Sequence, residues 1–114
     1  MLEARHVSIS IARAPDDVYA YASQLANLAA WASGVSDDML VVFTPHNELG
    51  VLDHDVTVGG QTFHNPMRVV PNADGSEVVF TLLRQPGTSD ADFARDAATI
   101  AGDLTTLKQL LERT

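Results

Sequence analysis

One histidine and one asparagine are the residues of this sequence best placed to do chemistry. Gly59 and Gly60 stand between two stretches of alternating apolar residues. Adjacent glycines at such a point are typical of a two-residue hairpin, because they supply the positive φ that its turn needs. That turn sets the register of the two strands and brings His54 opposite Asn65. Since side chains alternate between the faces of a sheet, His54 and Asn65 point the same way.

Most of the other side chains on that face are apolar, Gln61 being the exception, so we expect it to be the inner face. A buried imidazole or amide without a hydrogen-bond partner costs roughly 1–3 kcal/mol. The two side chains therefore either satisfy each other or hydrogen-bond a ligand. Because a neutral imidazole both donates and accepts, His54 is also a candidate catalytic acid or base. Further candidates for a ligand-binding wall on this face are Leu52, Val56, Phe63 and Met67.

A second hairpin extends the candidate wall. The turn at residues 72–75 pairs Pro71 with Ser76 and points Phe80 and Arg84 inward. Arg84, at the end of its strand, either anchors a carboxylate or phenolate of the ligand or only extends its charge to solvent. Trp31 either lines the cavity or is an ordinary core aromatic. Ala97 and Ala101 are small residues of the last helix that leave room for a ligand or allow close packing.

The opposite face of the first hairpin carries polar residues and is expected to be solvated. Asp55 lies opposite His64, next to Asp53. Two carboxylates and an imidazole are an incomplete and exposed ligand set, so an ion pair is expected there and no metal. The sequence contains no phosphate-binding glycine loop, nucleophile elbow or dinucleotide fingerprint. No cofactor is predicted.

The elements that position these residues follow from periodicity. Alternation over Arg5–Ala12 predicts a strand, and Pro15 followed by two aspartates predicts a helix start. The alanine-rich stretch to Ala32 predicts two short helices that break near Ser23. Strands are predicted over Met39–Thr44, Leu49–Val58, Gln61–Val70 and Glu77–Arg84, joined as an antiparallel meander. The last element is one helix with Ser89 as N-cap and a buried stripe of Phe93, Ala97, Ile100, Leu104, Leu107 and Leu111.

Composition narrows the function classes. The chain has 114 residues, which suits one domain over residues 1–114. It carries 7 Lys and Arg against 15 Asp and Glu, a net charge of −8, which argues against nucleic acid and anionic membranes as partners. No run reaches the roughly 18–20 apolar residues of a membrane helix, so no membrane insertion is expected. The sequence has no cysteine, which fits a cytoplasmic location.

Three segments resemble a known family. They are Val7–Ala12, Ala14–Tyr21 (Ala-Pro-Asp-Asp-Val-Tyr-Ala-Tyr) and Asn27–Trp31. This "aPxdVy…W" pattern after an opening strand resembles the START-like, or SRPBCC, superfamily in its polyketide cyclase/dehydrase-like branch. The resemblance implies an α+β helix-grip fold. In that fold a curved antiparallel sheet, here of about five strands or more, wraps the long C-terminal helix and encloses an apolar cavity.

Three functions fit these residues. The leading hypothesis is binding of a small hydrophobic or aromatic molecule, lipid-like or polyketide-like, between the sheet and the last helix. The second is a cyclase or dehydratase-like enzyme in which His54 transfers protons and Asn65 or Arg84 stabilises an oxyanion. The third is an interaction module without a ligand that uses an open sheet edge, for example to form a homodimer.

Overall fold

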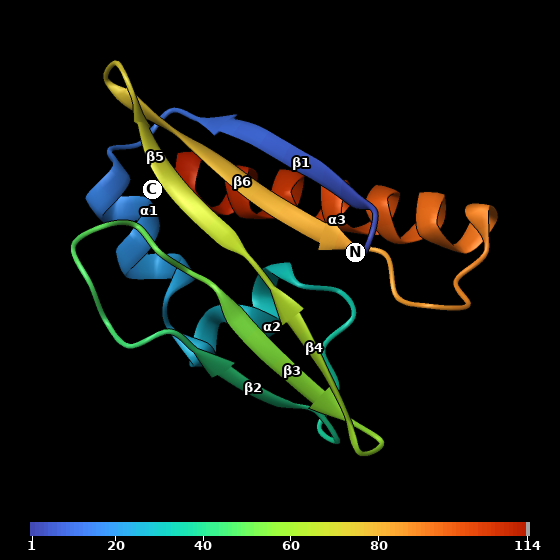
Figure 1. Cartoon of the computed structure of the whole chain (residues 1–114). Coiled ribbons are helices and arrows are strands. Elements are labelled where there is room, and N and C mark those ends of the chain that lie inside the picture. The colour runs from blue at the N-terminus through green and yellow to red at the C-terminus, as the bar shows by residue number, and fades with distance from the viewer. Residues whose placement is uncertain (114) are drawn as a thin grey trace.

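The elements follow the order predicted from the sequence: one strand, short helices, a run of antiparallel strands and a long final helix (Figure 1). The computed structural model describes residues 1–113. Its helices are α1 (Pro15–Ala22), the short 3₁₀ helix η1 (Leu25–Asn27), α2 (Leu28–Trp31) and α3 (Asp90–Glu112). Its strands are β1 (Ala4–Ile11), β2 (Leu40–Phe43), β3 (His54–Val58), β4 (Gln61–Asn65), β5 (Met67–Asn72) and β6 (Gly75–Leu83).

The strands form two antiparallel, three-stranded sheets, ordered β1-β6-β5 and β2-β3-β4. The Gly59-Gly60 turn joins β3 to β4 and places His54 opposite Asn65. The second turn joins β5 to β6 and pairs Pro71 with Ser76. Both registers predicted from the turns are confirmed. The β3-β4 and β5-β6 hairpins thus have the strand pairings from which the sequence pattern assigned their inward-facing residues.

The sheet bends sharply where β4 passes into β5. The sequence predicted a single strand over residues 61–70, but Pro66 lacks an N–H and splits it in two. The Asp53 carboxylate fills the gap by accepting hydrogen bonds from the Met67 N–H at 2.8 Å and from the Arg68 guanidinium at 2.7 and 3.0 Å. Residues 1–113 therefore form six strands where the pattern marked five segments.

The two sheets remain linked through this bend. The predicted strand 49–58 forms a regular ladder only from His54 on. Its first part still pairs with β5, because the Leu52 N–H donates to the Met67 carbonyl at 2.8 Å and the Val69 N–H donates to the Gly50 carbonyl at 2.9 Å. This irregular pairing holds the β2-β3-β4 sheet at an angle to the other sheet, as Figure 1 shows.

Helix α3 packs along the β1-β6-β5 sheet. The Ser89 hydroxyl caps it by accepting the Asp92 N–H at 3.1 Å, as predicted. Its buried side chains contact β1 and β6, and α2 contacts α3 from another side. The buried residues of α3 are Phe93, Ala97, Leu104, Leu107 and Leu111, the predicted stripe except that Ile100 is only partly buried.

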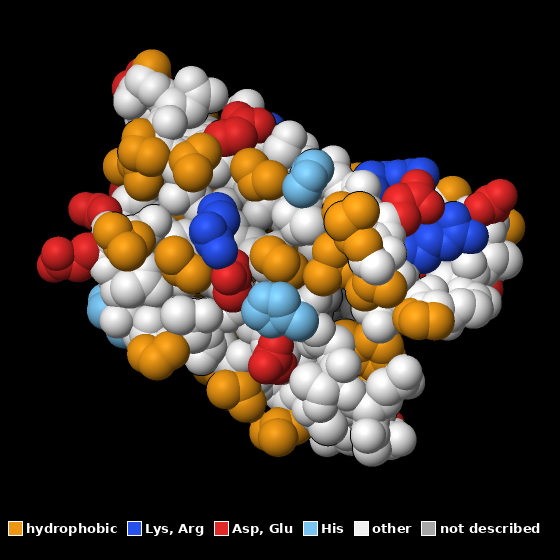
Figure 2. Space-filling view, in the orientation of Figure 1, with side chains coloured by type: hydrophobic (Ala, Val, Ile, Leu, Met, Phe, Trp, Pro, Cys, Tyr) orange, Lys and Arg blue, Asp and Glu red, His pale blue; other side chains and the backbone are white. Residues whose placement is uncertain are grey.

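Charged and apolar side chains are interspersed on the face of the molecule drawn in Figure 2. On the face drawn in Figure 2, Lys and Arg side chains lie in separate small groups among acidic and apolar ones. No helix within residues 1–113 combines the length and the apolar character that crossing a membrane requires.

Candidate ligand cavity

A cavity of about 620 Å³ lies between the two sheets, α2 and residues 92–104 of α3. Side chains from α2, β2, β3, β4, β6 and α3 form its wall, and most of them are apolar. Exposed residues of loop 84–88, of segment 34–39 and of α3 border it as well, so the cavity opens to solvent there. The apolar wall includes Trp31, Val56, Phe63, Phe80 and Ile100.

His54 lies in the wall of this cavity and is only 7% exposed. Its ring packs between two aromatic side chains, with ring centroids 5.1 Å from that of Phe43 and 5.9 Å from that of Phe80. Nδ1 lies 2.9 Å from the Leu52 carbonyl oxygen. Because a carbonyl only accepts, Nδ1 carries the proton and Nε2 is left as an acceptor. Nε2 has no hydrogen-bond partner within residues 1–113.

Burial sets the charge of this imidazole. Desolvation lowers the pKa of His54 below its ordinary value, because the charged form loses water on burial. The hydrogen bond to the Leu52 carbonyl and the nearby Asp53 carboxylate oppose this shift more weakly. His54 is therefore neutral at pH 7, with a basic nitrogen unused. Such a group can accept a proton or a hydrogen bond from a bound molecule.

Two more polar side chains border the cavity without a partner. Asn65 lies directly opposite His54 but does not bond to it, and its amide makes no hydrogen bond in the described part of the chain. Trp31 is 5% exposed, and its indole Nε1 is a buried donor that has no acceptor within residues 1–113. Unsatisfied buried polar groups are uncommon in folded proteins. Trp31 Nε1 is the one such atom in the described part of the chain, and together with the unpartnered Nε2 of His54 and the unpartnered amide of Asn65 it fits a site that is completed by a bound molecule.

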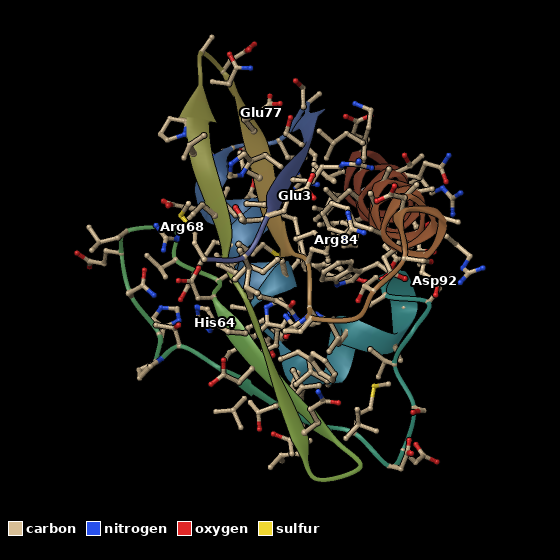
Figure 3. The ribbon with its side chains drawn as sticks, turned by 45° about the vertical axis from the view of Figure 1, so that its right-hand side comes forward. Glu3, His64, Arg68, Glu77, Arg84 and Asp92 are labelled. Atoms are coloured by element: carbon tan, nitrogen blue, oxygen red, sulfur yellow. The ribbon has the colours of Figure 1, made fainter. Side chains whose placement is uncertain are left out.

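Arg84 also borders the cavity, but its guanidinium is already engaged. Nε and one terminal nitrogen donate to the Thr88 carbonyl at 3.0 and 2.7 Å. The ion pairs with Glu3 and Asp90 measure 3.1 and 2.8 Å and raise the pKa of Arg84. Figure 3 shows Arg84 beside Glu3, next to the start of α3. Arg84 is thus neither a free anchor for an anionic ligand nor a charge merely extended to solvent, the two interpretations that the sequence left open: it ties loop 84–90 to the sheet end.

Known proteins of similar structure identify the fold. No protein-family model matches the chain, and neither does any curated protein. DynU16, from the dynemicin biosynthetic locus, has a TM-score of 0.77 at 14% identity, covering 96% of this chain and 47% of DynU16. Ara h 8.0201 has a TM-score of 0.70 at 9% identity, covering 100% of both chains. A Thalictrum flavum norcoclaurine synthase mutant in complex with a transition-state analogue has a TM-score of 0.64 at 13% identity, covering 99% and 96%.

All three are START-like folds, and the match spans every element from β1 to α3. The chain has the START-like fold. The resemblance read from residues Val7–Trp31 is thereby confirmed at the level of fold. The chain spans about half the length of DynU16, so these likenesses describe architecture and not activity.

Within this START-like fold, not all of the residues predicted to form the cavity wall border the cavity. Seven of them border the cavity: Trp31, His54, Val56, Phe63, Asn65, Phe80 and Arg84. Leu52, Met67 and Ala97 are buried in the core instead and do not border it. Ala101 is exposed, which corrects its assignment to the wall. The cavity lies along the other flank of α3, on the side of Asp96, Ile100 and Asp103.

That acidic flank is the part of the site that sequence reasoning missed. Asp96, Ile100 and Asp103 are spaced i, i+4 and i+7, so they share one side of the helix, next to the buried stripe. The spacing was present in the sequence. Which flank of the stripe borders the cavity depends on the angle between α3 and the two sheets, and periodicity does not give that angle.

The outer face of β3 and β4 carries ion pairs, as expected. The Asp55 carboxylate lies 2.7 Å from Nδ1 of His64, and both side chains are about half exposed. Arg68 lowers the pKa of Asp53 by its hydrogen bonds to that carboxylate. Within residues 1–113, His, Asp and Glu side chains form no cluster of three or more that could hold a metal ion.

The buried His54 predicts a pH dependence of stability. Below its ordinary pKa of about 6.5, the unfolded chain binds a proton at His54 that the folded chain does not, so stability falls as pH drops from 6.5 towards the lowered folded pKa. The slope from this group reaches about 1.4 kcal/mol per pH unit. Urea unfolding at several pH values between 5 and 7.5 measures it. His54→Gln should flatten the profile, and parallel profiles for the two proteins would contradict a buried neutral imidazole.

Proposed function

We propose that this chain binds a small apolar or aromatic molecule, lipid-like or polyketide-like, in the cavity between the sheets and α3. One observation carries the proposal. A mostly apolar space of about 620 Å³ is bordered by His54, Asn65 and Trp31, each with a polar group that no other residue of 1–113 satisfies. Ligand sites are of this size, roughly 300–1,000 Å³, and combine an apolar wall with a few polar groups that orient the ligand.

The similar structures agree with this proposal. One comes from a biosynthetic locus, and another was solved with a transition-state analogue bound. Both contain the same arrangement of a sheet and a long terminal helix. Their names describe those proteins, and they give the present chain a class of ligand to test rather than a particular molecule.

Native mass spectrometry of the freshly purified protein is the direct test. We expect a discrete mass increment on the folded protein that disappears on denaturation and identifies the class of the retained molecule. Titration with the neutral probe 2-(1-naphthyl)ethanol, followed by calorimetry, measures occupancy of the emptied cavity. A protein that carries no molecule and does not bind the probe up to its solubility limit would contradict ligand binding.

Catalysis is the second candidate, and the state of His54 favours it. A neutral imidazole with a free Nε2 in an apolar, partly enclosed cavity can take a proton from a bound molecule. Asn65, on the facing strand position, can hydrogen-bond a developing oxyanion. A carrier and an enzyme would use the same cavity, but only the enzyme would convert the bound molecule into a product.

His54→Gln separates a carrier from an enzyme. Glutamine keeps a polar side chain but cannot transfer a proton, so an enzyme is expected to lose roughly 10²–10⁴-fold in kcat while its affinity for the substrate changes little. The molecule released from the purified protein serves as the substrate, with turnover followed by mass spectrometry. Unchanged turnover by His54→Gln would exclude the proton-transfer role.

The interaction module remains the outcome if no small molecule binds. Edge strand β2 exposes Leu40 and Val42, which are 62% and 56% exposed. A dimer at micromolar concentration in size-exclusion chromatography, together with a failure of ligand binding, would favour that function.

A further inference from the structure

The charges around the cavity restrict the ligand further. Arg84 is the only Lys or Arg of residues 1–113 that borders it. Its charge is offset by the ion pairs with Glu3 and Asp90, and each of its three guanidinium nitrogens already contacts one of those carboxylates or the Thr88 carbonyl. His54 is neutral. An anionic ligand therefore finds no free positive charge in this wall, within a chain whose net charge is −8.

The flank of α3 that borders the cavity carries three carboxylates instead. Asp92 forms an ion pair with Arg95, a neighbour on the helix. Asp103 accepts a hydrogen bond from the Ser33 N–H at 3.1 Å, which leaves its second oxygen free. Asp96 has no hydrogen-bond or ion-pair partner in the described chain. Figure 3 labels Asp92 on α3. The mouth of the cavity is thus acidic along one side.

An acidic rim alone does not make a site, but here the interior supplies independent evidence for a ligand. His54 borders the same cavity, is 7% exposed, and keeps an Nε2 that no residue of 1–113 satisfies. Trp31 also borders the cavity, is 5% exposed, and its buried indole N–H has no acceptor within residues 1–113. Ile100 lies between the turns that carry Asp96 and Asp103 and joins this rim to the apolar wall. One molecule can therefore contact the acidic rim and the apolar interior at once.

We propose that the cavity selects amines: an aromatic or alkyl body in the apolar interior and an ammonium group at Asp96 and Asp103. This inference rests on the proposed ligand-binding function and names the charge of its ligand. A carboxylate or phosphate on the same body is disfavoured, because the rim repels it and Arg84 is occupied. The proposed ligand is positively charged, whereas Arg84 as an anchor in the sequence suggested a negatively charged ligand.

Three probes with one apolar body test the charge: 2-(1-naphthyl)ethylamine, 2-(1-naphthyl)ethanol and 1-naphthylacetate. Calorimetry at pH 7.4 and low ionic strength gives the three dissociation constants. The carboxylates of Asp96 and Asp103 are at least partly open to solvent and would lie within a few ångströms of the ammonium group of a bound amine. We therefore expect the amine to bind about tenfold more tightly than the alcohol, and the anion about tenfold more weakly than the alcohol. Salt at about 0.5 M should remove most of the difference, because the rim is open to solvent.

Charge-neutral variants locate the effect. Asp96→Asn and Asp103→Asn should each reduce the amine-to-alcohol preference about threefold, and asparagine at 103 can still accept the Ser33 N–H. Asp74→Asn is the matched control, because it removes the same charge from the exposed turn between β5 and β6, away from the cavity. It should leave the preference unchanged.

The outcomes separate the two proposals. If the alcohol binds but the amine and the anion bind equally well, the amine inference is overturned and ligand binding stands. The same holds if Asp74→Asn changes the preference as much as Asp96→Asn does. If none of the three probes binds, ligand binding and the inference drawn from it both fail.

Discussion

Replacing Gly50 with alanine is expected to lower the free energy of unfolding by about 3 kcal/mol. Gly50 has φ +73°, a left-handed conformation that disfavours any side chain. A Cβ at this position would lie 2.2 Å from the Val69 carbonyl oxygen, which belongs to the backbone and cannot rotate away. The backbone has to shift, and the shift strains the hydrogen bond from the Val69 N–H to the Gly50 carbonyl. Denaturation by urea, followed by circular dichroism, measures the loss.

Gly59→Ala is the matched control for that experiment. Gly59 also has a positive φ, +58°, but apart from its chain neighbours no residue has an atom within 4 Å of where its Cβ would be. Alanine there adds backbone strain without a collision, so we expect a loss of about 1–2 kcal/mol. Equal losses at Gly50 and Gly59 would show that the chain does not approach β5 as closely as described at the bend between the two sheets.

The sequence predicts the register of the site well because local turn chemistry controls it. Gly59 and Gly60 require a tight hairpin, and a tight hairpin leaves one pairing of β3 with β4. From that pairing alone, His54 and Asn65 follow as neighbours on an inward face. The starts of two helices could also be predicted from local residues, because Pro15 begins α1 and Ser89 caps α3.

The parts of the fold and of the site that the sequence did not predict depend on contacts between residues far apart in the chain. The bend at Pro66 requires the Asp53 carboxylate, 14 residues from Met67, to replace a strand hydrogen bond. The engagement of Arg84 requires Glu3, 81 residues away. Neither partner can be identified from periodicity. Such contacts explain why Arg84, interpreted from the sequence as either a ligand anchor or a charge extended to solvent, instead holds loop 84–90 to the sheet end.

The angle between α3 and the two sheets explains why the helix residues that border the cavity were predicted wrongly. A helical stripe shows which residues are buried, but a cavity borders only one flank of that stripe. Ala101 lies on the solvent side, whereas Asp96 and Asp103 lie on the cavity side. For this reason the sequence pointed to small residues as the ligand contact, and the structure brings carboxylates there.

Filling the cavity with two indoles is expected to weaken binding of 2-(1-naphthyl)ethanol at least 30-fold while leaving the chain folded. Val56 on β3 and Ile100 on α3 border the cavity from different elements, and both are only partly buried, so each position has space on the cavity side. In the double variant Val56→Trp/Ile100→Trp the new side chains occupy the volume a ligand needs. Calorimetry gives the affinity, and circular dichroism with a thermal melt checks the fold, for which overpacking costs about 1–3 kcal/mol.

The control uses the adjacent positions on the same two elements. Thr57 and Thr99 neighbour Val56 and Ile100, but Thr57 lies on the outer face, where its hydroxyl is 2.8 Å from that of Thr62, and Thr99 is exposed on α3. Thr57→Trp/Thr99→Trp adds the same two indoles outside the cavity, so the affinity should change less than twofold. Because strand neighbours point to opposite faces, the two double variants differ mainly in where their side chains lie. Equal affinities for both would mean that the probe binds somewhere other than this cavity.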